Sequence, residues 1–163
     1  MESNEVPENP SQYAVHCEIE VRFRDLDAMG HVNNAVYFTY FEVGRTKYMR
    51  SLGHWPEEEA SDQSMGEKYP FIMLDAYCRF RSPARLGEKL TVHLRIPALG
   101  KKSFRFEYLI TGQDGRLVAS GHSAQVTFDY RAGKSIEIPA WLAERVERLE
   151  GRTLRNPRAE AKP

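Results

Sequence analysis

The sequence has few of the features that mark specialised protein classes. Its 163 residues include only two cysteines, which is too few for a disulfide scaffold, and their spacing is no metal signature. The 23 basic residues are balanced by 23 acidic ones, so no overall charge attracts nucleic acid or an anionic membrane. No apolar run has the length of a membrane span, and the N-terminus is acidic and polar. These absences predict a cytoplasmic protein that binds neither nucleic acid nor membrane.

The composition that is present is typical of one globular domain, with 41% hydrophobic and 11% aromatic residues. Residues 1–12 are polar, contain Pro7 and Pro10, and predict a flexible N-terminal segment. Residues 13–150 carry the periodic patterns of a folded domain. Residues 151–163 are basic and predict a flexible C-terminal tail.

Hydrophobic periodicity divides the first third of the chain into a strand and a helix. Alternating apolar and polar residues predict a strand over residues 14–25 with one buried face. From Asn34 to Leu52 the period becomes helical, with one stripe formed by Tyr37, Phe41, Gly44, Tyr48 and Leu52. Glycine in a helix costs about 1 kcal/mol relative to alanine, so Gly44 predicts a close approach between helix and sheet.

The rest of the chain reads mainly as strands. Expected strands cover residues 71–81, 89–97, 103–111 and 117–129, and Asp114-Gly115 predicts a hairpin between the last two. Short helices are expected near residues 61–68 and over 139–149. The order predicts an α+β fold in which a helix packs on one face of an antiparallel sheet. No second long helix is available for the other face, which favours self-association.

The residues best suited to chemistry lie between Asp25 and Asn34. Asp25 and Asp27 follow a strand, and a turn through Gly30 and His31 leads to the start of the helix. A carboxylate beside the amide-rich end of a helix suits attack on a carbonyl whose oxygen needs N–H donors. From the residues alone, Asp27 is either such a catalyst or an aspartate that caps a turn.

The string Asp25-Leu26-Asp27-Ala28-Met29-Gly30-His31-Val32-Asn33-Asn34-Ala35-Val36-Tyr37-Phe38 resembles the signature of hotdog-fold acyl-CoA thioesterases, the 4-hydroxybenzoyl-CoA thioesterase-like group. The resemblance extends from Val15 to Trp141 and includes supporting motifs at residues 79–88, 99–104 and 138–141. It implies a single hotdog domain, in which a five-stranded antiparallel sheet wraps around one long central helix.

The resemblance also implies an activity, the hydrolysis of an acyl-CoA to free acid and CoA. Asp27 matches the catalytic carboxylate, as nucleophile or general base, and the backbone N–H of Asn34 polarises the thioester carbonyl. His31 matches a histidine of the catalytic set in related acyl-carrier-protein thioesterases. Coenzyme A is part of the substrate, and no further cofactor or metal is implied. The active sites are expected at subunit interfaces of a homodimer or homotetramer.

The phosphates of coenzyme A are expected at a cationic turn. The matching residues are Lys101, Lys102 and Ser103, with Arg85 as a weaker candidate from a second cationic cluster. For the two lysines the alternative is a solvated hairpin tip.

Several residues near this motif have two possible roles. His31 is a catalyst or a backbone-bonded turn residue, while Asp25 and Asn33 fit structural roles better. Glu42 on the helix is the second candidate carboxylate. A hotdog-fold dehydratase and a non-catalytic acyl-CoA-binding module are the competing functions, and the acyl preference is undetermined.

Overall fold

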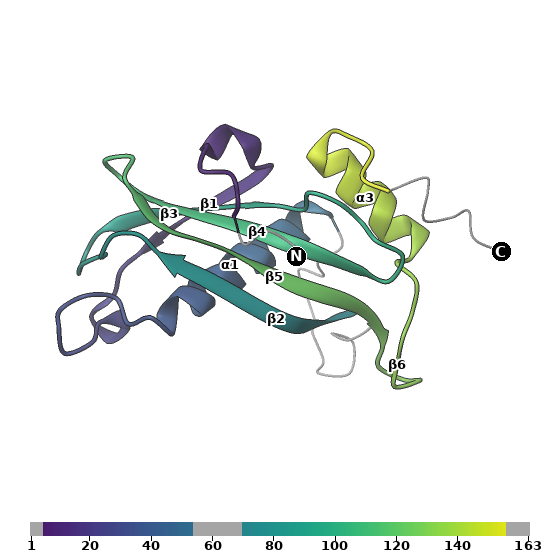
Figure 1. The fold of residues 1–163 in the computed structure, drawn as a ribbon, viewed down its shortest axis with the longest axis horizontal. Helices are drawn as coiled ribbons and strands as arrows, with labels where there is room; N and C mark the ends of the chain where they lie inside the picture. The colour runs from purple at the N-terminus through teal and green to yellow at the C-terminus, as the bar shows by residue number, and fades with distance from the viewer. Residues whose placement is uncertain (1–4, 54–69, 156–163) are drawn as a thin grey trace.

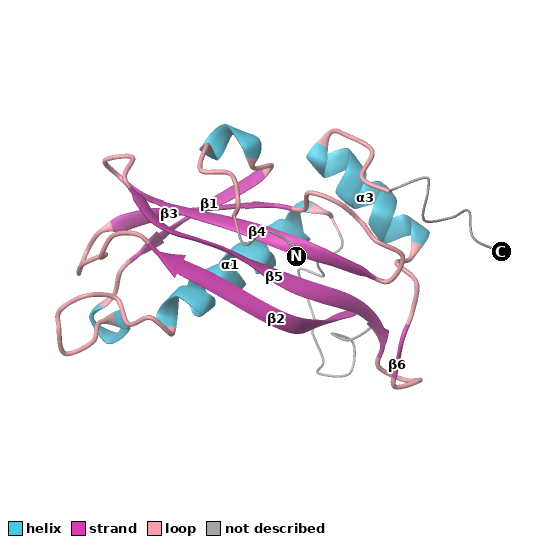
Figure 2. Ribbon diagram, viewed as in Figure 1, coloured by secondary structure: helices cyan, strands magenta, loops and turns pink. Residues whose placement is uncertain are grey.

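The computed structural model describes residues 5–53 and 70–155, and the helix expected near residues 61–68 lies outside them. Its main element is an antiparallel sheet in the order β1-β3-β4-β5-β2, with the short β6 paired to β5 (Figures 1 and 2). The strands are β1 (Val15–Glu20), β2 (Phe71–Phe80), β3 (Lys89–Arg95), β4 (Ser103–Gly112), β5 (Leu117–Asp129) and β6 (Lys134–Ser135). Of the helices in the described part, none is long and apolar enough to cross a membrane.

The helix α1 (Val36–Ser51) lies across one face of the sheet, and the sheet curls around it (Figure 1). All five residues of the expected apolar stripe are buried. Phe41 stacks on Tyr108 of β4, with ring centroids 4.1 Å apart and ring planes 11° from parallel. The hotdog arrangement predicted from the sequence is therefore confirmed.

Gly44 marks a close approach between α1 and the sheet. A Cβ atom at this position would lie 2.6 Å from Cδ1 of Leu94 and 3.1 Å from Cγ1 of Val92, both on β3. Such distances are inside van der Waals contact, and both neighbours are fully buried. The expected close approach is confirmed, and it explains why the helix contains a residue that weakens it.

The first strand is shorter than predicted. β1 ends at Glu20 instead of continuing to residue 25, and the 3-10 turn η2 (Phe23–Asp25) follows. The turn forms because the side chain of Asp25 accepts hydrogen bonds from the Arg22 amide at 2.9 Å and from the Arg22 guanidinium. Phe23, expected on the buried face, is 80% exposed as a consequence.

A second helix, α3 (Ala140–Glu150), closes the end of the molecule near the last turn of α1. Its Leu142, Ala143 and Val146 join the core, and Pro139 stands at its N-cap, as the sequence predicted. Glu150 accepts a hydrogen bond from the Tyr48 hydroxyl at 2.6 Å. It also accepts one from the Ile96 amide at 2.7 Å, so one carboxylate joins α3 to α1 and to the end of β3.

Candidate active site

Residues 26–32 form a tight turn with Asp27 near its start. The Asp27 amide donates to the carbonyl of His31 at 2.8 Å, and the amide of Gly30 donates to the carbonyl of Asp27 at 3.1 Å. Gly30 has a φ of 75°, a conformation that other residues rarely adopt. The turn therefore brings His31 close to Asp27.

The carboxylate of Asp27 is held through one oxygen. Oδ1 accepts hydrogen bonds from the amides of Met29 at 2.8 Å and His31 at 3.4 Å. Within residues 5–53 and 70–155, Oδ2 accepts no hydrogen bond from the protein. The side chain is half-buried, so one oxygen fixes its direction while the other is available for chemistry.

The segment between the turn and α1 leaves one backbone donor unused. Oδ1 of Asn33 accepts the Ala35 amide at 2.9 Å, and the carbonyl of Asn33 accepts the Val36 amide at 2.9 Å. The helix begins at Val36, so Asn34 precedes it and does not open it, contrary to the sequence-based expectation. The amide of the exposed Asn34 has no acceptor in the described part of the chain, so it can donate to a ligand.

Asp25 stabilises this turn through its side chain and its backbone carbonyl. Its buried carboxylate accepts the Tyr40 hydroxyl at 3.0 Å and pairs with the guanidinium of Arg22 at 2.9 Å, while its carbonyl accepts the Asn33 amide at 2.9 Å. Burial raises the pKa of Asp25, but the hydrogen bonds from Arg22 and Tyr40 outweigh burial and leave the pKa below its usual value. These contacts fit the structural role expected for Asp25.

Asp27, His31 and Asn34 lie together on a surface depression of about 260 Å³. The structure therefore brings together the three residues expected to be catalytic. The depression is completed by Val32, Tyr37, Phe80, Arg81, Ser82 and Pro83.

Most of these additional residues were not identified as site residues from the sequence. The segment of residues 80–83 reaches Asp27 because the amide of Val32 donates to the carbonyl of Ala84 at 2.9 Å. Residues 79–88 form one of the supporting motifs, but no local pattern shows which distant turn they contact. Tyr37 was identified only as a member of the buried helix stripe.

Of the residues expected to bind phosphate, Lys101, Lys102 and Ser103 lie far from the depression along the sheet, whereas Arg85 lies two residues after Pro83, which lines the depression. Ser103 pairs with Val126 on β5, whereas Phe80 of the depression pairs with Ala119, seven residues away. At about 3.3 Å per residue, the two groups lie about 23 Å apart along the sheet. Lys101 and Lys102 are exposed, and Lys101 pairs with Glu137 at 3.0 Å. Arg85 is exposed, and its amide donates to Glu88 at 3.1 Å.

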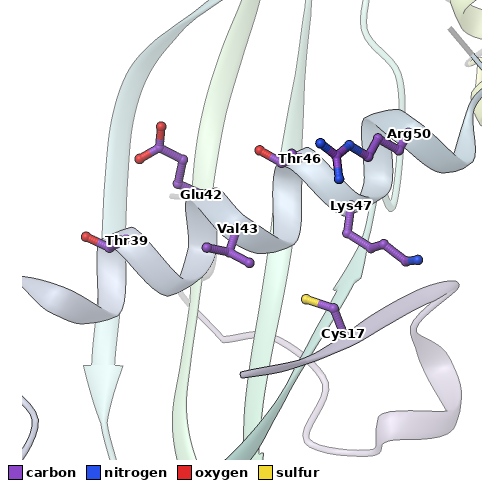
Figure 3. Close-up of a pocket in the computed structure, with 7 residues that line it drawn as sticks. All are labelled: Cys17, Thr39, Glu42, Val43, Thr46, Lys47 and Arg50. Carbon is purple, nitrogen blue, oxygen red and sulfur yellow. The ribbon is translucent and has the colours of Figure 1, made fainter. Parts of the chain in front are cut away.

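Glu42, the second candidate carboxylate, is also separate from Asp27. It is exposed on α1 and lines a different depression of about 420 Å³ (Figure 3). That depression is shared with Cys17, Thr39, Val43, Thr46, Lys47 and Arg50. Within one chain, the two carboxylates therefore line different depressions.

No group of three or more His, Cys, Asp or Glu side chains in the described ranges is placed to hold a metal ion. The Asp25 carboxylate is already occupied by Arg22 and Tyr40. The depression offers the Asp27 carboxylate, the His31 imidazole and the Asn34 backbone N–H, together with the polar side chains of Tyr37, Arg81 and Ser82.

The chain is similar to known thioesterases. FadM of Escherichia coli K12, a long-chain acyl-CoA thioesterase, is 28% identical over 136 residues, covering 81% of this chain and 96% of that protein. ATL3 of Arabidopsis thaliana, a chloroplastic acyl-acyl carrier protein thioesterase, is 33% identical over 126 residues, covering 76% of this chain and 62% of that protein.

A crystal structure of a thioesterase from Thermus thermophilus, complexed with coenzyme A and Zn, superimposes with a TM-score of 0.73. It is 33% identical, and the match covers 86% of this chain and 97% of that one. The prediction of a thioester hydrolase is confirmed at the level of the family. The family model of the thioesterase-like superfamily matches residues 21–146, from the end of β1 into α3, and the chain belongs to that superfamily.

Proposed function

We propose that this protein hydrolyses acyl-CoA thioesters to a free acid and CoA, with Asp27 as the reacting carboxylate. The observation that carries the proposal is the shared depression, which holds both the Asp27 carboxylate and Asn34, whose amide can donate to a ligand. A carboxylate and a backbone donor on one surface are what acyl transfer to water requires. The relatives named above act on acyl-CoA or acyl-carrier-protein thioesters.

In the proposed reaction, the thioester carbonyl oxygen accepts a hydrogen bond from the Asn34 amide. That bond strengthens as negative charge develops on the oxygen. Asp27 then acts in one of two ways. As a nucleophile it attacks the carbonyl carbon and expels the thiolate, and water hydrolyses the resulting anhydride. As a general base it takes a proton from water, which attacks the carbon directly.

In either route, the role proposed for His31 is to donate a proton to the departing thiolate. Its backbone amide and carbonyl both contact Asp27, which keeps its position in the turn fixed relative to the carboxylate. Replacing His31 with glutamine then lowers kcat for substrates whose thiols leave poorly. An activated aryl thioester, whose thiolate needs no proton, is expected to be insensitive to the replacement.

The primary test is thiol release from a panel of acyl-CoAs by the wild-type protein and by Asp27→Asn. We expect a loss of at least about a thousandfold in kcat for the variant with an unchanged fold, because the amide is neither nucleophile nor base. Asp114→Asn, at the exposed β4–β5 turn, serves as the matched control. Unchanged turnover in Asp27→Asn would exclude the mechanism. Binding without turnover in the wild type would indicate a binding module, and formation of a double bond would indicate a dehydratase.

The two routes for Asp27 are separated by one turnover in ¹⁸O-labelled water. A nucleophilic carboxylate acquires the label when water opens the anhydride at the Asp27 carbonyl, and a general base never acquires it, so label in Asp27 establishes the nucleophilic route. Mass spectrometry of the peptide that contains Asp27 reads this difference directly.

A homodimer or homotetramer is part of the proposal. β2 is an edge strand in the described sheet, and its Met73, Leu74 and Phe80 are 43%, 61% and 45% exposed. A second subunit at this edge would cover them. It would also allow Lys101, Lys102 and Ser103 of one chain, with Arg85, to bind the phosphates of a CoA whose thioester lies in the Asp27 depression of the other chain. Light scattering coupled to gel filtration tests the assembly, and a monomer at micromolar concentration would contradict it.

We also place the enzyme in the cytoplasm. The support is chemical: both thiols, Cys17 and Cys78, are free rather than paired. Fractionation of cells that express the protein at its natural level checks this location.

A further inference from the structure

Two arginines at the end of β2 line a second depression beside the one that contains Asp27. This depression, of about 330 Å³, is lined by Glu5, Val6, Glu8, Arg79, Arg81 and Ser120. Arg81 lines both depressions, so they meet at its side chain. Phe80 contacts Tyr37 on the α1 side of the sheet, so Arg79, its neighbour within β2, faces the opposite side.

The N-terminal segment forms one wall of this second depression. It runs over the face of the sheet opposite α1 (Figure 1). The carboxylate of Glu8 forms an ion pair with the guanidinium of Arg81. The hydroxyl of Tyr13 holds the segment in place by donating to the carbonyl of Pro7 at 2.6 Å. The Glu8 carboxylate is therefore paired with a cation that would also attract another anion.

The ion pair is of the kind that a ligand can displace. The side chains of Arg81 and Glu8 are 37% and 53% exposed, and such pairs change an equilibrium by about fivefold at most. A phosphate offers more oxygen acceptors and more charge than a carboxylate, and the planar guanidinium binds it through two parallel hydrogen bonds. The hydroxyl of Ser120, whose residue pairs with Arg79 across the two strands, lies in the same depression.

We propose that Arg79 and Arg81 bind the phosphate at the end of a pantetheine arm, and that Glu8 holds this place when no substrate is bound. The assignment rests on the proposed thioester hydrolysis, because the pantetheine arm links the thioester to that phosphate. The arm then runs from the Asp27 depression past Arg81 into the arginine depression. The same phosphate occurs in coenzyme A and on acyl carrier proteins, so the site recognises the feature that both carriers share.

The test compares three thioesters of one acyl group. Acyl-pantetheine carries no phosphate, acyl-4′-phosphopantetheine carries the one phosphate in question, and acyl-CoA adds the nucleotide with its further phosphates. Replacing Arg81 with glutamine is expected to raise KM about tenfold for the two phosphorylated substrates and to leave KM for acyl-pantetheine within about twofold. Replacing Glu8 with glutamine is expected to lower KM about threefold for the same two substrates, with kcat unchanged.

The two replacements combined give the sharpest result. In the Arg81→Gln background, the Glu8→Gln exchange is expected to have a smaller effect on KM than in the wild type, because the arginine with which Glu8 forms its ion pair is gone. Arg148→Gln and Glu20→Gln, both distant in sequence from the arginine depression, are the charge-matched controls. Equal changes of KM for all three substrates in Arg81→Gln would overturn the site, as would an unchanged KM for acyl-phosphopantetheine.

An effect of Arg81→Gln on acyl-CoA alone would mean that Arg81 binds the nucleotide, and this too would overturn the assignment. Hydrolysis of acyl-pantetheine by the wild type tests the proposed reaction separately, since it needs no phosphate. Failure of the phosphate site is therefore distinguishable from failure of the proposed function.

Discussion

The hydroxyl of Tyr40 on α1 donates a hydrogen bond of 3.0 Å to Oδ2 of Asp25, two residues before Asp27. Both residues are buried, and Arg22 supplies the opposite charge to the same carboxylate. The turn that carries Asp27 is thus tied to the helix that follows the Asn34 amide. We expect this contact to help fix the position of the Asp27 carboxylate relative to the Asn34 amide.

Removing the Tyr40 hydroxyl is expected to weaken both the fold and the reaction. Tyr40→Phe leaves a buried carboxylate with one donor fewer, which costs about 1–3 kcal/mol in the free energy of unfolding. We expect a lower kcat with a smaller change in KM, measured by urea unfolding and by thiol release. Tyr130→Phe, which removes an exposed hydroxyl that donates to Phe71, serves as the control and is expected to change neither.

The Asn33 side chain is expected to control the position of the Asn34 amide. Asn33→Ala removes the acceptor of the Ala35 amide and is expected to cost about 1 kcal/mol of stability and to lower kcat. Asn33→Asp keeps an acceptor oxygen at the same place and is expected to retain most of the activity. Thermal melts and initial rates on one acyl-CoA measure both effects. Equal rates for the alanine and aspartate variants would show that the cap does not matter.

Gly44→Ala is expected to destabilise the protein although alanine favours helices. The added Cβ would lie 2.6 Å from Cδ1 of the buried Leu94, and overpacking of this kind costs about 1–3 kcal/mol. The gain in helix propensity offsets only about 1 kcal/mol of it. Chemical unfolding measures the change. Combining Gly44→Ala with Leu94→Ala provides the check: the double variant is expected to lose less stability than the sum of the single losses, because the second change makes room for the first.

Glu147 is expected to contribute to stability only above acidic pH. Hydrogen bonds from the side chain of Arg155 and from the amides of Leu154 and Arg155 lower the pKa of Glu147 from 4.5 to about 2. A lowered pKa means that the folded state binds fewer protons, so the contribution is complete above pH 4.5 and disappears as the pH falls toward about 2. Glu147→Gln is therefore expected to lose about 1 kcal/mol at pH 6 and nothing near pH 2.

The measurement for Glu147 is urea unfolding at a series of pH values. Glu144→Gln, on the exposed side of the same helix, is expected to follow the wild-type curve. A stability difference between wild type and Glu147→Gln that stays constant down to pH 2 would contradict the assignment.

Both thiols are expected to be unreactive in the folded protein. Burial raises the pKa of Cys78 to about 12 and also raises the pKa of Cys17, whereas the thiolate is the form that reacts. The neutral thiol is therefore the dominant form of Cys78 at pH 8. Ellman's reagent is expected to titrate both cysteines rapidly in denaturant and neither rapidly without it. Immediate reaction of the native protein would show that a thiol is accessible and ionised.

Local patterns were sufficient for most of the fold. The helical stripe of α1, the strands of the second half and the close approach at Gly44 follow from periodicity and glycine placement, which depend on neighbouring residues only. The prediction that β1 reaches residue 25 was wrong because alternation cannot show that the Asp25 side chain captures the Arg22 amide and turns the chain.

The sequence by itself determined that Asp27, His31 and Asn34 lie together, because they fall within eight consecutive residues, which have little freedom to separate. Only the tertiary structure decided what faces them. Arg81 and Ser82 reach Asp27 through the pairing of Val32 with Ala84, and Lys101 to Ser103 lie at the far end of the sheet. Such placements depend on which distant segments pair as strands. The alternation of apolar and polar residues in a strand shows which of its faces is buried, but it does not identify the segment that buries that face.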